Sequence, residues 1–249
     1  MHTISNINEK KYKEKLCNIL KCTGYNEKNM VRVLSFDIGT KNLAFCDLEV
    51  DKNGTKNDGP LLFEKKDDIE KNVCSITIYA WDVCDISSGK KHDIHVVAPN
   101  LLKLLEERFD ASLEHVTNVV IENQPVMKNP IMKSIQMVMF TYFHMMKKMR
   151  YPDLNIHLIS AANKTKVTRL LPKEQAEALT NQSATEAKNT KGYKFNKTLA
   201  QHLSKALLSF MTHPSFHTDA TPWSEHYERH KKRDDLADAF LQGLQFLAS

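Results

Sequence analysis

The sequence predicts an α/β fold in which a mixed five-stranded sheet is flanked by helices. Three apolar or alternating segments come first, separated by turn residues, which indicates strands that run antiparallel to one another. Two further apolar segments then alternate with segments of helical periodicity, an order that favours parallel crossovers. The 249 residues, 41% of them hydrophobic, suffice for one such domain with a small appendage.

The strands are identified by β-branched and apolar residues between turn signals. The first is a continuous apolar run typical of a buried strand, and Gly39-Thr40 turns the chain after it. The third alternates between two faces, and a polar segment at residues 51–68 precedes it as a loop or hairpin tip. The five predicted strands are residues 31–38, 42–50, 73–83, 116–121 and 154–159.

The helices are identified by apolar residues three and four positions apart. One of them opens with Pro130, a residue favoured in a first helical turn. The polar residues 172–195 contain few large apolar side chains and predict a loop, either mobile or ordered by a ligand. Residues 1–30 predict a short basic helical extension, packed on the main domain or serving as a DNA-binding appendage. The four predicted helices are residues 101–113, 130–149, 197–211 and 228–247.

Composition narrows the class of protein. The net charge of +5 and the pI of about 8.8 fit a polyanionic partner. There is no run of 18 apolar residues, so we expect no membrane partner. Residues 1–15 lack an apolar signal core, and the odd count of five cysteines favours reduced thiols. A cytoplasmic location is expected, with mitochondrial and nuclear locations left open.

Four acidic residues stand out by their positions. Asp37 interrupts an apolar strand, and Glu122 ends another. Asp235 and Asp238 are three residues apart on a predicted helix and therefore share one of its faces. Clustered carboxylates repel one another and need a positive charge, and hard oxygen ligands suit Mg²⁺ or Mn²⁺. We therefore expect two such ions per site, which hydrolyse a phosphodiester.

Each acid alone also has an ordinary structural explanation. Asp37 could cap a turn, and Glu122 could pair with a lysine. Acids at i and i+3, such as Asp235 and Asp238, usually mark a solvated helix face. Their combination with these strand positions favours catalysis. Asp234 is adjacent to the last pair, but the three-residue spacing favours Asp235 as the ligand.

Three motifs resemble those of RuvC-type Holliday junction resolvases, especially the poxviral and fungal mitochondrial branches. Residues 35–44, Ser-Phe-Asp-Ile-Gly-Thr-Lys-Asn-Leu-Ala, resemble the first motif of that family. Residues 120–125, Val-Ile-Glu-Asn-Gln-Pro, resemble the second, and this is the most specific single match. Residues 232–239, Lys-Arg-Asp-Asp-Leu-Ala-Asp-Ala, resemble the C-terminal helix motif. Residues 1–30 and an insert around residues 180–193 depart from the family pattern.

The resemblance implies an RNase H-like nuclease domain over residues 31–249 that resolves four-way DNA junctions by symmetric nicks. It implies that Asp37, Glu122, Asp235 and Asp238 bind two divalent ions and act as the catalytic residues. It also hints at a large DNA virus that replicates in cytoplasm. Phosphate contacts supply affinity in such proteins. The residues expected to contact DNA are Lys41, Asn42, Gln124, Lys164, Lys166, Lys191, Lys194, Lys232 and Arg233.

A homodimer is expected as well. Residues 127–149 hold seven of the ten methionines, together with Phe140, Tyr142 and Phe143. Methionine packs adaptably, and a helix that is apolar on more than one face indicates a second buried surface. The resemblance implies that this helix forms much of the interface between two subunits.

Three other functions are weighed against a junction resolvase. Asp37-Ile-Gly-Thr also resembles a phosphate loop of actin-like ATPases and sugar kinases, but seven glycines leave no second Gly-rich loop, so no nucleotide cofactor is expected. An RNase H-like nuclease for RNA–DNA hybrids or flaps keeps the same fold. A non-catalytic nucleic-acid-binding factor on a degenerate fold is the third, and the presence of all four acids argues against it.

Overall fold

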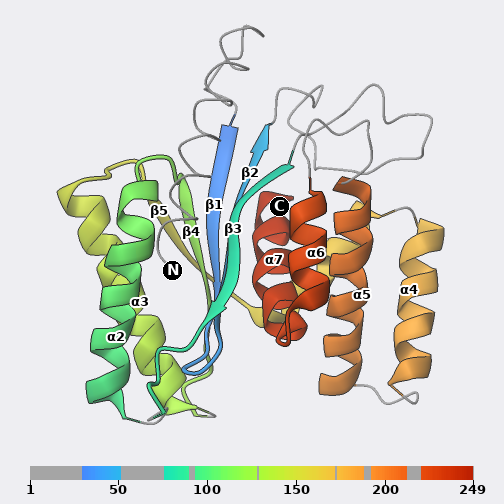
Figure 1. Cartoon of the computed structure of the whole chain (residues 1–249), viewed down its shortest axis with the longest axis horizontal. Helices are drawn as coiled ribbons and strands as arrows, with labels where there is room; N and C mark the ends of the chain where they lie inside the picture. Colours follow the sequence, from blue (N-terminus) through green and yellow to red (C-terminus); the bar gives the residue numbers. More distant parts are fainter. Residues whose placement is uncertain are drawn as a thin grey trace, which may run out of the picture. The chain divides into compact units, whose positions relative to one another are not determined.

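The computed structural model describes residues 30–51, 76–89, 93–127, 129–171, 173–187, 192–211 and 220–248. Its centre is one five-stranded sheet with the order β3-β2-β1-β4-β5 (Figure 1). The strands are β1 (Met30–Asp37), β2 (Leu43–Asp51), β3 (Ile76–Cys84), β4 (Asn118–Glu122) and β5 (Asn155–Ile159). β2 pairs with β3 antiparallel, whereas β4 lies parallel to both β1 and β5. The predicted mixed sheet is confirmed.

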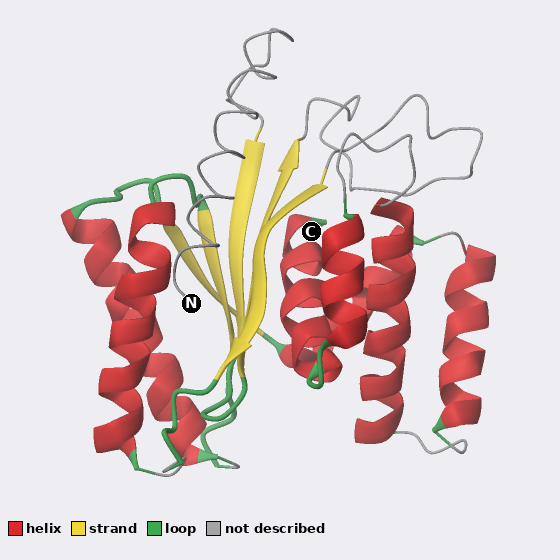
Figure 2. Cartoon of the chain, viewed as in Figure 1, coloured by secondary structure: helices red, strands yellow, loops and turns green. Residues whose placement is uncertain are grey.

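Helices cover both faces of this sheet (Figure 2). Helices α2 (Ile94–Phe109) and α3 (Pro130–Met149) lie on one face. Helix α7 (Arg233–Leu247) packs on the other, with α5 (Tyr193–Met211), α6 (Thr221–Arg229) and α4 (Lys173–Glu186) beyond it. A 3-10 segment, η4 (Ala161–Leu170), follows β5 and also contacts α7. This arrangement is consistent with the RNase H-like fold that the motifs implied.

The alternation of side chains along β1 divides the core into two clusters. Leu34 and Phe36 face α2 and α3, where they join an apolar cluster. Val33 belongs to the cluster on the α7 side. Ser35 is buried and receives a hydrogen bond from Gln242 of α7, so it also faces that side. The next residue of this second set is Asp37, which therefore points toward α7.

Several predicted boundaries are wrong in instructive ways. Helix α2 begins at Ile94 rather than at residue 101, because Asp93 caps it by accepting a hydrogen bond from the His95 N–H (3.0 Å). Pro99 lies inside this helix. Because proline disfavours the interior of a helix, the sequence did not indicate the turns that precede it. The predicted helix 228–247 is two helices, since α6 ends at Arg229 and α7 begins at Arg233.

The predicted loop at residues 172–195 is also a correction, because most of it forms helix α4 and the start of α5. Helix α4 packs through one large apolar side chain, Leu179, and otherwise through small ones. Ser183 is fully buried, and its hydroxyl lies 2.9 Å from His202 Nδ1 of α5. Ala187, just beyond the helix, is buried as well. A narrow contact surface of this kind gives little apolar periodicity in the sequence.

Some predictions fall on residues that are not described. These are the helical extension, apart from Met30, the loop tip at residues 52–68 and Lys191. Apart from Met30, the described residues belong to the unit Val31–Ser249. Within the described ranges, no helix has the length and apolar character needed to cross a membrane.

Candidate active site

Two of the predicted acids lie side by side because of strand pairing. β1 and β4 are parallel, with Ser35 opposite Val120 and Phe36 opposite Ile121. The next pair in this register is Asp37 and Glu122, the last residue of each strand. The preceding residues, Phe36 and Ile121, face α2 and α3. Because side chains alternate along a strand, Asp37 and Glu122 point to the α7 side. A parallel pair thus brings together two carboxyls that are 85 positions apart in the sequence.

Helix α7 supplies the third acid, and its close packing on the sheet sets the position of that acid. A Cβ atom at Gly243 would lie 2.8 Å from Leu48 Cδ2 and 3.2 Å from Ser35 Cβ, so the glycine permits this approach. One residue earlier, Gln242 is buried and donates from Nε2 to the Phe36 carbonyl (2.9 Å) and to Ser35 Oγ (3.2 Å). The same amide lies 3.4 Å from the Val120 carbonyl. It therefore fixes α7 against both acid-bearing strands.

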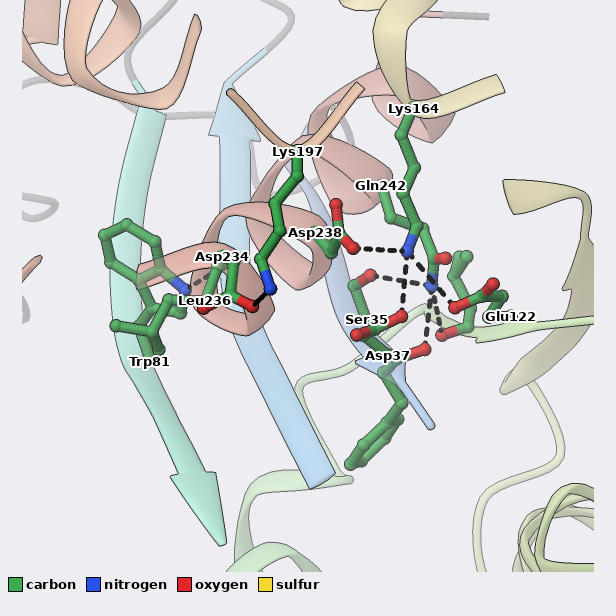
Figure 3. A network of polar contacts seen from close by, with 12 residues as sticks. Ser35, Asp37, Trp81, Glu122, Lys164, Lys197, Asp234, Leu236, Asp238 and Gln242 are labelled. Carbon is green, nitrogen blue, oxygen red and sulfur yellow. Dashed lines mark hydrogen bonds and ion pairs between the residues drawn. The ribbon is translucent and has the colours of Figure 1, made fainter. Parts of the chain in front are cut away.

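Lys164 of η4 lies at the centre of the acids (Figure 3). Its Nζ is 2.8 Å from Asp37 Oδ1 and 3.1 Å from Glu122 Oε2. The same Nζ lies 3.4 Å from Asp238 Oδ2 of α7. The lysine side chain is only 8% exposed, so three carboxyls from three elements surround one buried ammonium.

The charges in this cluster determine where protons reside. Burial would raise the pKa of Asp37, but the Lys164 ammonium and hydrogen bonds from Glu122 and Lys164 outweigh it and lower that pKa. Burial, then the hydrogen bond and charge of Asp37, raises the pKa of Glu122 to about 8. Burial opposes the charge on Lys164, yet the three acids raise its pKa. At neutral pH Asp37 is therefore ionised, Glu122 holds a proton and Lys164 is charged.

The two acids of α7 also carry raised pKa values. Burial is the main cause for Asp238, with Asp37 and Asp234 adding to it against the pull of Lys164, and its pKa is about 6. Burial likewise raises the pKa of Asp235 to about 6, followed by the charges of Asp234 and Asp37. Asp234 itself forms an ion pair with Lys197 of α5, apart from Lys164 (Figure 3). Mutual repulsion in the cluster is thus only partly neutralised.

The donor set fits a hard divalent cation in its chemistry. Asp37, Glu122 and Asp238 offer carboxylate oxygens around one point, and that point already holds a positive charge. The raised pKa values of Glu122 and Asp238 indicate that more positive charge at this point would be stabilising. With Lys164 in place, no group of three or more Asp, Glu, His or Cys side chains in the described part of the chain is arranged as a metal site.

The residues predicted to contact DNA have several different environments. Lys41, Lys166, Lys194 and Lys232 are exposed. When the Asn42 amide is oriented so that both its nitrogen and its oxygen are hydrogen-bonded, the oxygen accepts from Lys232 Nζ (3.3 Å). Arg233 pairs with Glu228 at 3.3 Å.

The two remaining described residues of that set are partly or fully buried. Gln124 is half-buried, and its backbone N–H donates to Gln136 Oε1 (2.8 Å). Lys164, predicted as a phosphate contact, is instead buried among the acids.

Sequence reasoning missed Gln242 and the place of Lys164. A glutamine within the apolar run of α7 is the signal that could have marked the first. Because a buried amide is costly unless it is hydrogen-bonded, an amide at this position indicates a partner across the sheet. Nothing in the sequence near Lys164 indicates burial. Its position follows from the strand order, which places the end of β5 close to the ends of β1 and β4.

Comparison with known sequences gives one relative. No protein-family model matches the sequence. An uncharacterized protein of Acanthamoeba polyphaga mimivirus is 30% identical over 163 residues, which are 64% of this chain. The match covers 35% of that protein, so the chain spans about a third of its length.

Solved structures similar to this chain include three resolvases. The yeast mitochondrial Holliday junction resolvase Ydc2 has a TM-score of 0.48 at 14% identity, over 92% of this chain and 84% of its own. The fowlpox virus resolvase, solved with substrate Holliday junction DNA, has a TM-score of 0.44 at 14% identity, over 87% and 97%. RuvC of Thermus thermophilus has a TM-score of 0.35 at 12% identity, over 73% and 96%.

At these identities the likeness concerns the fold alone. The fold predicted from the sequence is confirmed by the sheet order and the helical layers on its two faces. In structure, the chain is similar to RuvC-like Holliday junction resolvases, the family that its sequence motifs resemble.

Proposed function

We propose that this protein is a divalent-metal-dependent endonuclease that resolves four-way DNA junctions by symmetric nicks. The observation that carries the proposal is the convergence of Asp37, Glu122 and Asp238 on one point from β1, β4 and α7. These are three of the four acids that the motifs of junction resolvases supply. A buried group of acids at this cost in stability has its simplest explanation in a catalytic role.

The acids would hold the metal as a set. Asp37, Glu122, Asp235 and Asp238 would bind two ions, which when bound activate water and stabilise the leaving oxygen of a phosphodiester. Asp37 is the anchor of this set, because the Lys164 ammonium and hydrogen bonds from Glu122 and Lys164 outweigh burial and lower its pKa. Asp234 takes no part, because its carboxylate is neutralised by Lys197. This difference in partners favours Asp235 over Asp234 as the fourth ligand.

The basic residues beside the acids would position the DNA backbone. Lys41 and Lys232 are exposed, and Lys232 is held next to Asn42 in the turn after Asp37. Lys166 is exposed two positions after Lys164. Contacts of this kind fix the register of a duplex on the protein without reading its sequence. Binding should therefore weaken steeply as the salt concentration rises.

Helix α3 would form the interface of a homodimer. Its inner side is buried, with Ile135, Met139 and Phe143 fully covered. Its outer side exposes Met145 and Met149, at 52% and 66%. Exposed methionines on the second face of an otherwise packed helix suit an adaptable apolar contact. Two subunits would present two sites to the opposed strands of one junction.

Cleavage of defined substrates tests the proposal. We would incubate the protein with labelled four-way junction, linear duplex and RNA–DNA hybrid, each with Mg²⁺ or with EDTA. The expected result is paired, symmetric nicks in the junction alone, in Mg²⁺ alone. Cutting of the hybrid alone would instead indicate a nuclease of another substrate class, and binding without cutting would indicate a non-catalytic factor. Sedimentation of the same preparation measures whether it is a dimer.

The site of action is part of the proposal. We infer a cytoplasmic location in cells infected by a large DNA virus, supported by the poxviral character of the motifs and by the mimiviral relative. Immunofluorescence of infected cells would test this location.

A further inference from the structure

We propose that Lys164 is a resident counter-ion that occupies the metal position and has to withdraw before a divalent ion binds. The inference rests on the proposed function, because it concerns three of the four acids proposed to bind metal. It assigns to Lys164 a role that differs from the DNA contact expected from the sequence. The lysine would hold the acids together in the absence of metal and would set how tightly the metal binds.

The first support is the place of the ammonium. Lys164 Nζ contacts oxygens of Asp37, Glu122 and Asp238 at 2.8, 3.1 and 3.4 Å. No surface lysine of the described chain has such a setting. Lys173, for comparison, has a side chain that is 89% exposed and lies 3.9 Å from one partner, Glu177. The Lys164 side chain is 8% exposed and contacts three acids, so its ammonium supplies the positive charge that a bound cation would supply.

The second support is that a divalent ion and the ammonium need the same oxygens. Mg²⁺ binds carboxylate oxygens at about 2.1 Å and demands near-octahedral geometry. The oxygens around Lys164 Nζ lie at 2.8–3.4 Å, and the described residues offer no metal site as they stand. The acids therefore have to close in by roughly 1 Å for Mg²⁺. They cannot do so around an ammonium that stays in place.

The third support is the element that carries the lysine. η4 is a 3-10 segment of ten residues, longer than the three or four that such segments usually reach, and its hydrogen bonds are weaker than those of an α-helix. Val167 and Leu170 anchor its later part in the core beneath α7. The turn around Lys164 can therefore shift while that part stays packed. Asp238, with a side chain 38% exposed, marks the side that opens to solvent.

The consequence is a lowered apparent metal affinity. A site that is closed by its own lysine about 90% of the time binds metal about tenfold more weakly than an open one. Withdrawal would also place the Lys164 ammonium at the solvent-facing edge of the site, where it could form an ion pair with a DNA phosphate. Metal and DNA would then favour each other's binding, because both are compatible with the withdrawn lysine.

Titration with Mn²⁺ in the absence of DNA tests the inference directly. We would measure the Mn²⁺ affinity of the wild type, Lys164→Gln and the exposed control Lys173→Gln by electron paramagnetic resonance at pH 7.5. The expected result is binding at least about tenfold tighter in Lys164→Gln, and no change in the control. Equal or weaker binding in Lys164→Gln would overturn the inference while leaving the proposed function intact. Absence of Mn²⁺ binding in both the wild type and Lys164→Gln would overturn both.

A second measurement uses the wild type alone, in case Lys164→Gln does not fold. Reductive methylation, quantified for each lysine by mass spectrometry, reports how accessible each amine is. Without metal, Lys164 should be protected whereas Lys173 reacts. Saturating Mn²⁺ should raise the methylation of Lys164 several-fold and leave Lys173 unchanged. Protection of Lys164 that is the same with and without Mn²⁺ would show that the lysine stays in place, which contradicts the inference.

Discussion

The two faces of strands β1 and β4 have opposite chemistry. Toward α2 and α3, Leu34, Phe36 and Ile121 enter a cluster without any charge, in which Phe36 lies 5.4 Å from Phe109 between ring centroids. Toward α7, the alternate residues end in Asp37 and Glu122, around a buried ammonium. One pair of strands thus has a dry, tightly packed side and a side with concentrated charge.

This difference indicates a division of labour. The apolar side supplies free energy of folding through burial, and nothing on it has to move. The charged side weakens the fold, because it buries acids whose pKa values are raised. The free energy gained on the apolar face therefore offsets the cost of burying the acids on the charged face. Substitutions on the apolar face should accordingly lower stability, whereas substitutions of the acids on the charged face should lower activity.

The largest effect is expected on cleavage. Asp37→Asn or Glu122→Gln should slow junction cutting by roughly 10³-fold or more, since each removes several kcal/mol of transition-state stabilisation through the metal. Binding of the junction, measured by mobility shift in Ca²⁺, should persist. Glu122→Gln should leave the folded state about as stable as the wild type, because Glu122 already holds a proton at neutral pH. Asp37→Asn should weaken it, because the buried Lys164 ammonium loses an ionised partner. Cutting at the wild-type rate by either variant would mean that these acids are not the site.

The next effect concerns stability on the apolar face. Phe109→Ala should lower the free energy of unfolding by about 3–5 kcal/mol, because Phe109 is buried against the rings of Phe36 and Phe45. Urea denaturation measures this loss. Leu102→Ala on the same helix is the control, since Leu102 is 37% exposed and should cost much less. If the variant stays folded, its affinity for Mn²⁺ should match the wild type. A large drop in Mn²⁺ affinity would break the proposed separation.

A smaller effect is expected where the two faces meet α7. Gln242→Met keeps the length of the side chain but leaves the Phe36 carbonyl and Ser35 Oγ without this donor. The free energy of unfolding should fall by about 1–3 kcal/mol. Because α7 then loses its register on β1, Mn²⁺ affinity should also fall while junction affinity is kept. Unchanged Mn²⁺ affinity would reduce Gln242 to a purely structural role.

The smallest effect is a dependence of stability on pH. Folding raises the pKa of Glu122 to about 8 and those of Asp235 and Asp238 to about 6, so the folded state holds these protons more tightly than the unfolded state. In EDTA, stability should therefore fall as the pH rises from about 4.5 to 8. Subtracting the free energy of unfolding of Glu122→Gln from that of the wild type at each pH removes the contribution of the histidines, which both proteins share. A wild type that gains stability relative to that variant over this range would contradict the charge assignment.

The sequence predicted the sheet and the acids Asp37, Glu122 and Asp238 that meet around Lys164, because local patterns mark the strands and the positions of these acids. The apolar runs before Asp37 and Glu122 marked two strands and their ends, and the order of elements implied parallel pairing. Helix α4 was missed because small residues such as Ser183 pack without leaving a hydrophobic period. The place of Lys164 was missed for another reason. It depends on the meeting of three elements distant in sequence, and the residues next to it carry no trace of that contact.

Manganese anomalous scattering from crystals of the protein would locate metal at the acids without depending on any substrate. We expect two Mn²⁺ peaks about 4 Å apart, coordinated by Asp37, Glu122, Asp235 and Asp238, with Lys164 Nζ withdrawn from between them. Peaks elsewhere on the molecule, or an ammonium still seated between the carboxylates at saturating Mn²⁺, would contradict this expectation.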